Sequence, residues 1–370
     1  MAPALGMEYI LSSFAILLMQ FAEICRGGAT LVPTMPALRP WTTHRYQWAC
    51  RSTGREHMLT YATAGCGEPV VLLHGFGGSV DYWRATIPPI AAAGYKVYAL
   101  DMLGFGSSDK PTDVRYSAEL WAELTLDFLD EFVQRPAVLV GNSLGSLVAL
   151  SAAAGCVARR ASDAEGGDAG GARPVVGALA LLNCAGGMNS KFVLTDPERP
   201  RWQRALSAPI FALIDWVLTT PALRDRAFRA YASESTVRSI LLSVYTRKER
   251  VDDELVRAIL APAADPAAAE VFGAILTGEP GVQPRELVSR VRVPILAIWG
   301  ERDTFTPLDG PTGRLFAQLA RERPASVAMR VIDAGHVPHD DDPAAVLAEL
   351  LPFLAAHLKP QPCKTVGLRV

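Results

Sequence analysis

The pentapeptide Gly141-Asn142-Ser143-Leu144-Gly145 is the feature that most constrains how this chain can fold. An apolar run at residues 136–140 precedes it, and an Ala- and Leu-rich run at residues 146–158 follows it. These flanks predict a buried strand, then a sharp turn, then a helix. Glycine at both ends of such a turn leaves space that a side chain would fill. The pattern therefore predicts an elbow that holds Ser143 exposed at the N-terminus of a helix.

Strands and helices alternate along most of the chain. Short apolar runs bounded by turn residues predict buried strands at residues 58–62, 69–73, 96–100, 137–140, 175–182, 294–299 and 328–332. Helices are predicted at residues 117–132 and 343–358, and at residues 81–93 with an interruption at Pro88-Pro89. This alternation is typical of an α/β fold with a mostly parallel central sheet flanked by helices.

The alternation stops between residues 186 and 286, where amphipathic helices are predicted at 209–218, 222–231, 237–245, 252–260 and 267–276. A helical block between two strands of one sheet indicates a helical cap. We therefore expect a core at residues 45–185 and 287–358, a cap at 186–286 and a C-terminal tail at 359–370. The low-complexity stretch at residues 159–174 predicts a flexible surface insertion in the core.

The first 44 residues differ in character from the rest. Residues 9–21 are strongly apolar, but they are fewer than the roughly 20 residues that a spanning helix needs. They also lack the basic start of a secretory signal. Residues 26–45 contain arginines but no acid, which loosely resembles an organelle transit sequence. We expect a targeting or membrane-interfacial leader at residues 1–44, and a disordered leader is the alternative.

Charge and cysteine usage exclude several classes of protein. The net charge of −2 gives no electrostatic footprint for a nucleic-acid partner. The six cysteines are scattered without a C-x-x-C or other metal-ligand spacing. We therefore expect unpaired thiols in a reducing compartment and no metal site. No oligomeric state is indicated by the sequence.

Two residues in later loops supply the partners that Ser143 needs. A serine hydroxyl is a poor nucleophile near neutral pH, so it requires a base, and the base requires an acid to orient it. Asp303 follows the predicted strand 294–299, and His336 follows the predicted strand 328–332. The carboxyl ends of parallel strands are where open sheets bind ligands. We expect Ser143, Asp303 and His336 to form a catalytic triad, which needs no metal and no organic cofactor.

Two backbone N–H groups are predicted to form the oxyanion hole. One belongs to Leu144, next to the nucleophile at the start of the helix. The other belongs to Phe76 in the turn His74-Gly75-Phe76-Gly77-Gly78, which follows the strand 69–73. His74 and Asp101 are expected to hold their loops by hydrogen bonds. The alternative interpretations are that Ser143 only caps its helix and that the acid or the base is one of Glu301, Asp309 and His339.

These motifs resemble the chloroplast branch of the α/β-hydrolases, which includes pheophytinase and chlorophyll dephytylase. The resemblance rests on three stretches, His74-Gly75-Phe76-Gly77-Gly78-Ser79, Asp101-Met102-Leu103-Gly104-Phe105-Gly106-Ser107-Ser108-Asp109-Lys110-Pro111 and Gly141-Asn142-Ser143-Leu144-Gly145-Ser146. It is closer to chlorophyll dephytylase in Leu181-Leu182-Asn183-Cys184-Ala185-Gly186-Gly187-Met188-Asn189 and Thr306-Pro307-Leu308-Asp309-Gly310-Pro311. It covers roughly residues 45–358. The stretch Val337-Pro338-His339-Asp340 departs from it, because Cys-Pro-Gln-Asp is expected there.

The resemblance implies an α/β-hydrolase fold with the cap inserted before the strand that carries the acid. It implies a serine carboxylic ester hydrolase that releases chlorophyllide and phytol from chlorophyll, in the chloroplast and at the thylakoid membrane. Such an ester requires a large apolar cavity, and the apolar stretch 209–218 offers Phe211, Leu213 and Trp216 as substrate-binding residues. The alternatives are a pheophytin-specific phytyl esterase, an esterase, lipase or acyltransferase for another hydrophobic ester, and a non-enzymatic ligand receptor.

Overall fold

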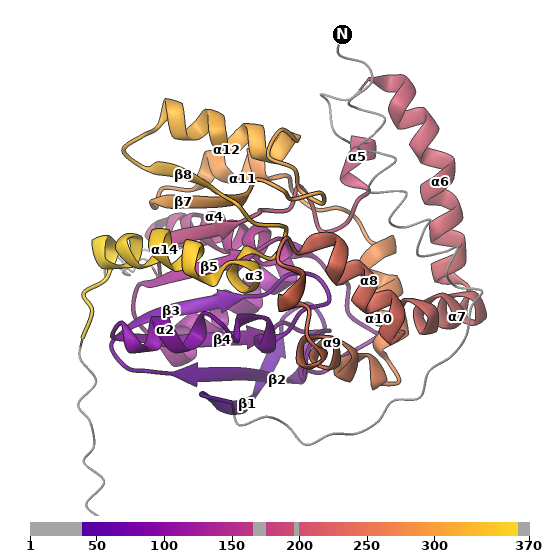
Figure 1. Cartoon of the computed structure of the whole chain (residues 1–370), viewed down its shortest axis with the longest axis horizontal. Helices are drawn as coiled ribbons and strands as arrows, with labels where there is room; N and C mark the ends of the chain where they lie inside the picture. The colour runs from indigo at the N-terminus through magenta and orange to yellow at the C-terminus, as the bar shows by residue number, and fades with distance from the viewer. Residues whose placement is uncertain (1–38, 166–174, 196–199, 362–370) are drawn as a thin grey trace, which may run out of the picture.

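The computed structural model describes residues 39–165, 175–195 and 200–361 (Figure 1). Within these residues an eight-stranded sheet has the order β1-β2-β4-β3-β5-β6-β7-β8. Strands β3 to β8 pair in parallel, whereas β2 is antiparallel to both β1 and β4. The strands are β1 Thr42–Cys50, β2 Arg55–Ala64, β3 Glu68–Leu73, β4 Tyr95–Asp101, β5 Ala137–Asn142, β6 Val176–Leu182, β7 Ile295–Gly300 and β8 Val327–Ile332.

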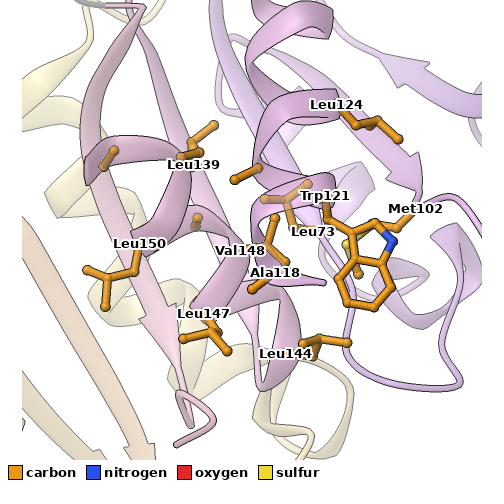
Figure 2. Packing of buried hydrophobic residues seen from close by; sticks show 14 of the residues in the cluster. Leu73, Met102, Ala118, Trp121, Leu124, Leu139, Leu144, Leu147, Val148 and Leu150 are labelled. Atoms are coloured by element: carbon orange, nitrogen blue, oxygen red, sulfur yellow. The ribbon is translucent and has the colours of Figure 1, made fainter. Parts of the chain in front are cut away.

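Helices cover both faces of this sheet, as expected for strands that are apolar on both sides. One face packs against α3 Ala118–Phe128, α4 Leu144–Glu165, α11 Pro284–Arg290 and α12 Pro311–Glu322. The other face packs against the short helix η1 Val80–Trp83, α2 Ile87–Ala92 and α14 Pro343–His357. Figure 2 shows the core between α3, α4 and the sheet, where Trp121 lies beside Met102. The predicted α/β-hydrolase architecture is confirmed.

Further helices lie between β6 and β7 in the chain and stand to one side of the sheet (Figure 1). They are α5 Phe192–Thr195, α6 Arg201–Thr219, α7 Pro221–Tyr231, α8 Glu234–Val244, η3 Lys248–Arg250, α9 Asp253–Leu260, η4 Ala261–Ala264 and α10 Ala268–Thr277. The helices α8 and α9 build a small apolar core of their own, and Val337 from the core domain joins it. The cap therefore packs directly against the loop that follows β8.

Two local predictions about secondary structure are wrong. Pro88 and Pro89 do not interrupt a helix, because they occupy the first turn of α2, where proline loses no hydrogen bond. The segment 159–174 is not wholly a loop, because α4 continues to Glu165. Alanine and arginine are strong helix formers, which explains why the helix persists until the glycines begin. Residues 166–174 lie outside the described residues.

The expected limits of the leader and the tail also differ from the structure. Strand β1 begins at Thr42, so the last residues assigned to a leader at 1–44 belong to the sheet. Residues 1–38 and 362–370 lie outside the described residues. The expectation of unpaired thiols is wrong for Cys66, which is disulfide-bonded, whereas Cys50 and Cys184 are free and buried. Spacing along the sequence does not reveal which cysteines a fold brings together.

Candidate active site

A strained turn between β5 and α4 presents Ser143. The backbone of Ser143 has a φ of 52°, in the left-handed region that non-glycine residues rarely adopt. A Cβ on Gly145 would overlap the carbonyl oxygen of Leu73, and a Cβ on Gly141 would overlap the backbone of Gly145. Both glycines are therefore required by sterics. The turn places the serine hydroxyl at the start of α4, as the pentapeptide predicts.

Ser143, His336 and Asp303 form one continuous chain of hydrogen bonds. The Oγ of Ser143 lies 2.9 Å from Nε2 of His336, and Nδ1 of His336 lies 2.8 Å from Oδ2 of Asp303. Because the carboxylate accepts the proton on Nδ1, Nε2 is left to accept the proton of the serine hydroxyl. These atoms stand in the order nucleophile, base and orienting acid.

Asp303 is buried and held in a fully bonded pocket. Its Oδ1 accepts hydrogen bonds from the N–H groups of Phe305 and Thr306, at 2.7 and 3.0 Å. Its Oδ2 accepts from the hydroxyl of Thr306 at 2.5 Å and from the side-chain amide of Asn183. Burial alone would raise the pKa of Asp303, but the charge and hydrogen bonds of His336 and Thr306 outweigh it and hold the pKa below its ordinary value. The carboxylate is therefore charged at neutral pH.

Asn183 was missed in the sequence. It sits directly after β6 with a φ of 47°, and its side-chain oxygen accepts a 3.1 Å hydrogen bond from the N–H of Gly300. It therefore ties the end of β6 to the end of β7 and orients the acid at the same time. The available signal was its position, because a polar residue at the carboxyl end of a parallel strand lies at the ligand-binding edge of the sheet.

The loop that carries His336 is fastened to the cap. The N–H of His336 donates to the carbonyl of Val244 in α8 at 2.9 Å. The carboxylate of Asp341 accepts hydrogen bonds from the N–H groups of Gly335, Thr246 and Arg247, at 2.7, 2.9 and 2.8 Å. Asp341 was not predicted, because two of its three partners, Thr246 and Arg247, come from a segment far away in the sequence.

Asp340, the residue before Asp341, is the buried centre of an ionic cluster. Its carboxylate is fully buried and accepts from Arg84, Arg250 and the hydroxyl of Tyr245, at 3.1, 2.9 and 3.0 Å. Arg84 also reaches Asp252 at the start of α9, at 2.8 Å. The cluster therefore joins the core, the histidine loop and the cap at one point.

The competing acids and base occupy unsuitable positions. Glu301 and Asp309 are exposed, whereas Asp303 is buried against the histidine. His339 is fully buried and packs against Trp83, with ring centroids 4.0 Å apart. Neither ring nitrogen of His339 has a hydrogen-bond partner in the described part of the chain. The geometry therefore favours Asp303 and His336 over these rivals.

Phe76 and Leu144, whose backbone N–H groups are predicted to form an oxyanion hole, lie around the same cavity as the serine. His74 supports the turn before Phe76, because its Nδ1 donates to the carbonyl of Gly75 at 2.7 Å and its Nε2 accepts from the N–H of Met102 at 3.1 Å. Burial lowers the pKa of His74 to about 4, so the ring is neutral and holds the loop instead of acting as a base.

A cavity of about 320 Å³ opens on Ser143 and His336. Its walls are mostly apolar and come from both the core and the cap, including Phe76, Phe211 and Phe272. Phe211 therefore lies where a substrate-binding residue was predicted. Leu213 and Trp216 do not, because they are 58% and 60% exposed and do not line the cavity. Phe211 points inward from α6, and the helical turn places the other two on its outer side.

No group of three or more His, Cys, Asp or Glu residues in the described ranges is arranged to hold a metal ion. The hydrogen-bonded chain by itself can activate the hydroxyl of Ser143 for attack on a carbonyl carbon. That the N–H groups of Phe76 and Leu144 stabilise the negative charge that such an attack develops on oxygen stays a prediction.

Comparison with known proteins gives a consistent result. A family model described as the alpha/beta hydrolase family matches residues 70–350. The chain is 23% identical over 287 residues to an uncharacterized hydrolase, YugF, of Bacillus subtilis, and this match covers 78% of this chain and 90% of that protein.

Solved structures share the architecture. A thermophilic esterase from Thermogutta terrifontis superposes with a TM-score of 0.61 at 21% identity, covering 85% of this chain and 99% of that one. A membrane phospholipase A, described as a bacterial virulence factor, superposes with a TM-score of 0.59 at 21% identity, covering 96% and 95%. At these identities the likeness shows the fold alone.

Proposed function

This chain belongs to the alpha/beta hydrolase family, and from that membership we propose that it is a serine carboxylic ester hydrolase for a hydrophobic ester. The observation that carries the proposal is the unbroken hydrogen-bond chain from Ser143 through His336 to Asp303. The strained backbone at Ser143 supports it further, because strain of this kind is retained where a function requires it.

In the proposed reaction, the Oγ of Ser143 attacks the ester carbonyl while its proton passes to Nε2 of His336. The N–H groups of Phe76 and Leu144 stabilise the resulting oxyanion. The intermediate collapses, and the leaving alcohol takes the proton from His336. Water then attacks the acyl-enzyme and gives a proton to His336. The second intermediate collapses, the departing Oγ of Ser143 takes that proton back from His336, and the acid is released. Asp303 keeps His336 in the required tautomer throughout.

For the substrate we propose the phytyl ester of chlorophyll, cleaved to chlorophyllide and phytol at the thylakoid membrane of the chloroplast. The motif resemblance to chlorophyll dephytylase supports this substrate, and so does the apolar lining of the cavity. A branched hydrocarbon chain has no polar group beyond its ester, so an apolar wall suits it.

A smaller hydrophobic ester is the second candidate, and the size of the cavity favours it. At about 320 Å³ the cavity lies at the lower end of the roughly 300–1,000 Å³ range of ligand pockets. It would enclose a small ester entirely. With a pigment, the ester and part of the chain would be enclosed while the macrocycle remained outside.

A parallel assay of purified protein on chlorophyll a, pheophytin a and an aryl butyrate tests these proposals. Release of chlorophyllide supports the dephytylase proposal, release of pheophorbide alone points to a pheophytin-specific enzyme, and turnover of the aryl ester alone supports the smaller substrate. Ser143→Ala should abolish every activity, with a loss of about 10⁵–10⁶ in kcat, and should still fold. Hydrolysis retained by this variant would refute the serine mechanism.

A further inference from the structure

The outer side of α6 is an exposed apolar surface. Trp202, Leu206, Leu213 and Trp216 are 48%, 62%, 58% and 60% exposed. Their spacing of four, seven and three residues places them along one side of the helix. The exposed residues between them are also apolar: Ala205, Ala208, Pro209 and Ala212. We call these eight residues the α6 outer face. Large aromatic side chains rarely gather in the open without a partner surface.

The opposite side of the same helix faces the active-site cavity. Ser207 and Phe211 are buried and line that cavity with Ser143. Figure 1 shows α6 along the outer edge of the molecule, with the other cap helices on its inner side. One helix therefore separates the cavity from whatever covers the α6 outer face.

Positive charge accompanies this face. The helices α6 and α7 together contain five arginines and two aspartates, a net charge of 5 − 2 = +3, although the whole chain carries −2. Both aspartates are paired, Asp215 with Lys191 at 2.7 Å and Asp225 with Arg224 at 3.1 Å. Arg201, Arg226 and Arg229 are exposed. The helices α6 and α7 are thus cationic on a weakly anionic protein.

We propose that the α6 outer face docks on the surface of a membrane that contains anionic lipid. A helix that presents tryptophan and leucine on one side, with arginines beside it, suits the boundary between headgroups and acyl chains. No single helix in the described ranges is long and apolar enough to cross a membrane, although two bent helix pairs, one of them α6 with α7, are long and apolar enough when taken together. At 19 residues, α6 would lie flat over roughly 28 Å of the surface.

Docking on a membrane would bring the active site to esters dissolved in the bilayer, and this role rests on the proposed esterase function. A substrate dissolved in the bilayer would reach the cavity past α6 without crossing water. The docking itself, however, is measurable without turnover, so its failure is distinguishable from a failure of the esterase proposal.

The test measures binding to vesicles of phosphatidylcholine with or without phosphatidylglycerol. Trp202 and Trp216 are the exposed tryptophans of the described chain, Trp41 is half-buried, and Trp48, Trp83, Trp121 and Trp299 are buried. A blue shift of tryptophan emission on adding vesicles, reduced by the Trp202→Gln substitution, therefore reports on the α6 outer face. We expect this shift, together with co-sedimentation, for vesicles with phosphatidylglycerol, and an affinity that falls as salt rises.

A double variant, Trp202→Gln with Leu206→Gln, should bind these vesicles at least tenfold more weakly, which corresponds to about 1.4 kcal/mol. It should still hydrolyse a water-soluble aryl ester at the wild-type rate, because neither residue lines the cavity. Val331→Gln is the matched control, since Val331 is 48% exposed on the edge strand β8, and it should bind like wild type.

Three outcomes overturn the proposal. The first is undiminished vesicle binding by the double variant, and the second is no vesicle binding by the wild type. The third is a dimer in light scattering that the double variant abolishes, which would show that a second copy covers the face.

Arg226→Gln with Arg229→Gln should weaken binding only to vesicles with phosphatidylglycerol. Equal affinity of the wild type for both vesicle types would refute the anionic requirement.

Discussion

Replacing His339 with phenylalanine should make the fold less sensitive to acid. His339 is fully buried against Trp83, and neither of its ring nitrogens has a hydrogen-bond partner among the described residues. Burial, aided by the nearby His336 and His74, lowers the pKa of His339 to about 3. Phenylalanine keeps the aromatic contact with Trp83 and removes the titrating group.

The sign and size of the effect follow from proton linkage. The pKa of an exposed histidine in the unfolded chain is about 6.5. Between about 3 and 6.5 the unfolded chain binds a proton that the folded chain excludes, so folding stability falls as pH falls through this window. pH 5 lies about 1.5 units below the pKa of the unfolded chain. At ~1.4 kcal/mol per unit, the unfolding free energy at pH 5 is lowered by about 2 kcal/mol.

The measurement is urea unfolding of wild type and His339→Phe at pH 7 and pH 5. The unfolding free energy of the variant should exceed that of wild type by about 2 kcal/mol more at pH 5 than at pH 7. Groups that do not interact with His339 titrate equally in both proteins and cancel in this comparison. An advantage of the same size at both pH values would refute the reasoning.

Two further predictions concern the site itself. Asp303→Asn should lower kcat by about 10⁴ in an aryl ester assay, because the amide favours the wrong tautomer of His336. Because the folded pKa of Asp303 lies below its ordinary value, the charged carboxylate stabilises the fold above about pH 3.9, and the gap in unfolding free energy between wild type and this variant should shrink below that pH. An unchanged gap would contradict the assigned pKa direction. Gly145→Ala should yield little folded protein by circular dichroism, because its Cβ would overlap the backbone of Leu73, whereas Gly155→Ala, in the open part of α4, should fold normally.

Local chemistry accounts for what could be predicted. The turn at Ser143 is encoded by its neighbours, since only glycine fits at positions 141 and 145. Apolar runs in the sequence predict the buried strands, and Asp303 and His336 follow two of these strands. Because parallel strands end at a common edge, position after a strand was enough to bring these residues together.

Features that depend on distant segments could not be predicted. The stretch 209–218 of α6 is apolar on nearly every side, so its sequence did not distinguish the inward Phe211 from the outward Leu213 and Trp216. The contribution of Asp341 depends on backbone N–H groups near Thr246, which carry no sequence signal. The pairing of Cys66 likewise depends on tertiary structure.

The bonds between the histidine loop and α8 limit how this enzyme can admit its substrate. If the whole cap moved away from the core as a rigid body, Val244 and Thr246 would move with it. Because both are hydrogen-bonded to the histidine loop, this motion would pull the imidazole of His336 away from Ser143. The helices α8 and α9 are therefore the fixed part of the cap, and the ion pairs of Arg84 with Asp340 and Asp252 hold them to the core. An opening of the cap that keeps the reacting groups aligned would therefore leave α8 and α9 in place and move α5 to α7.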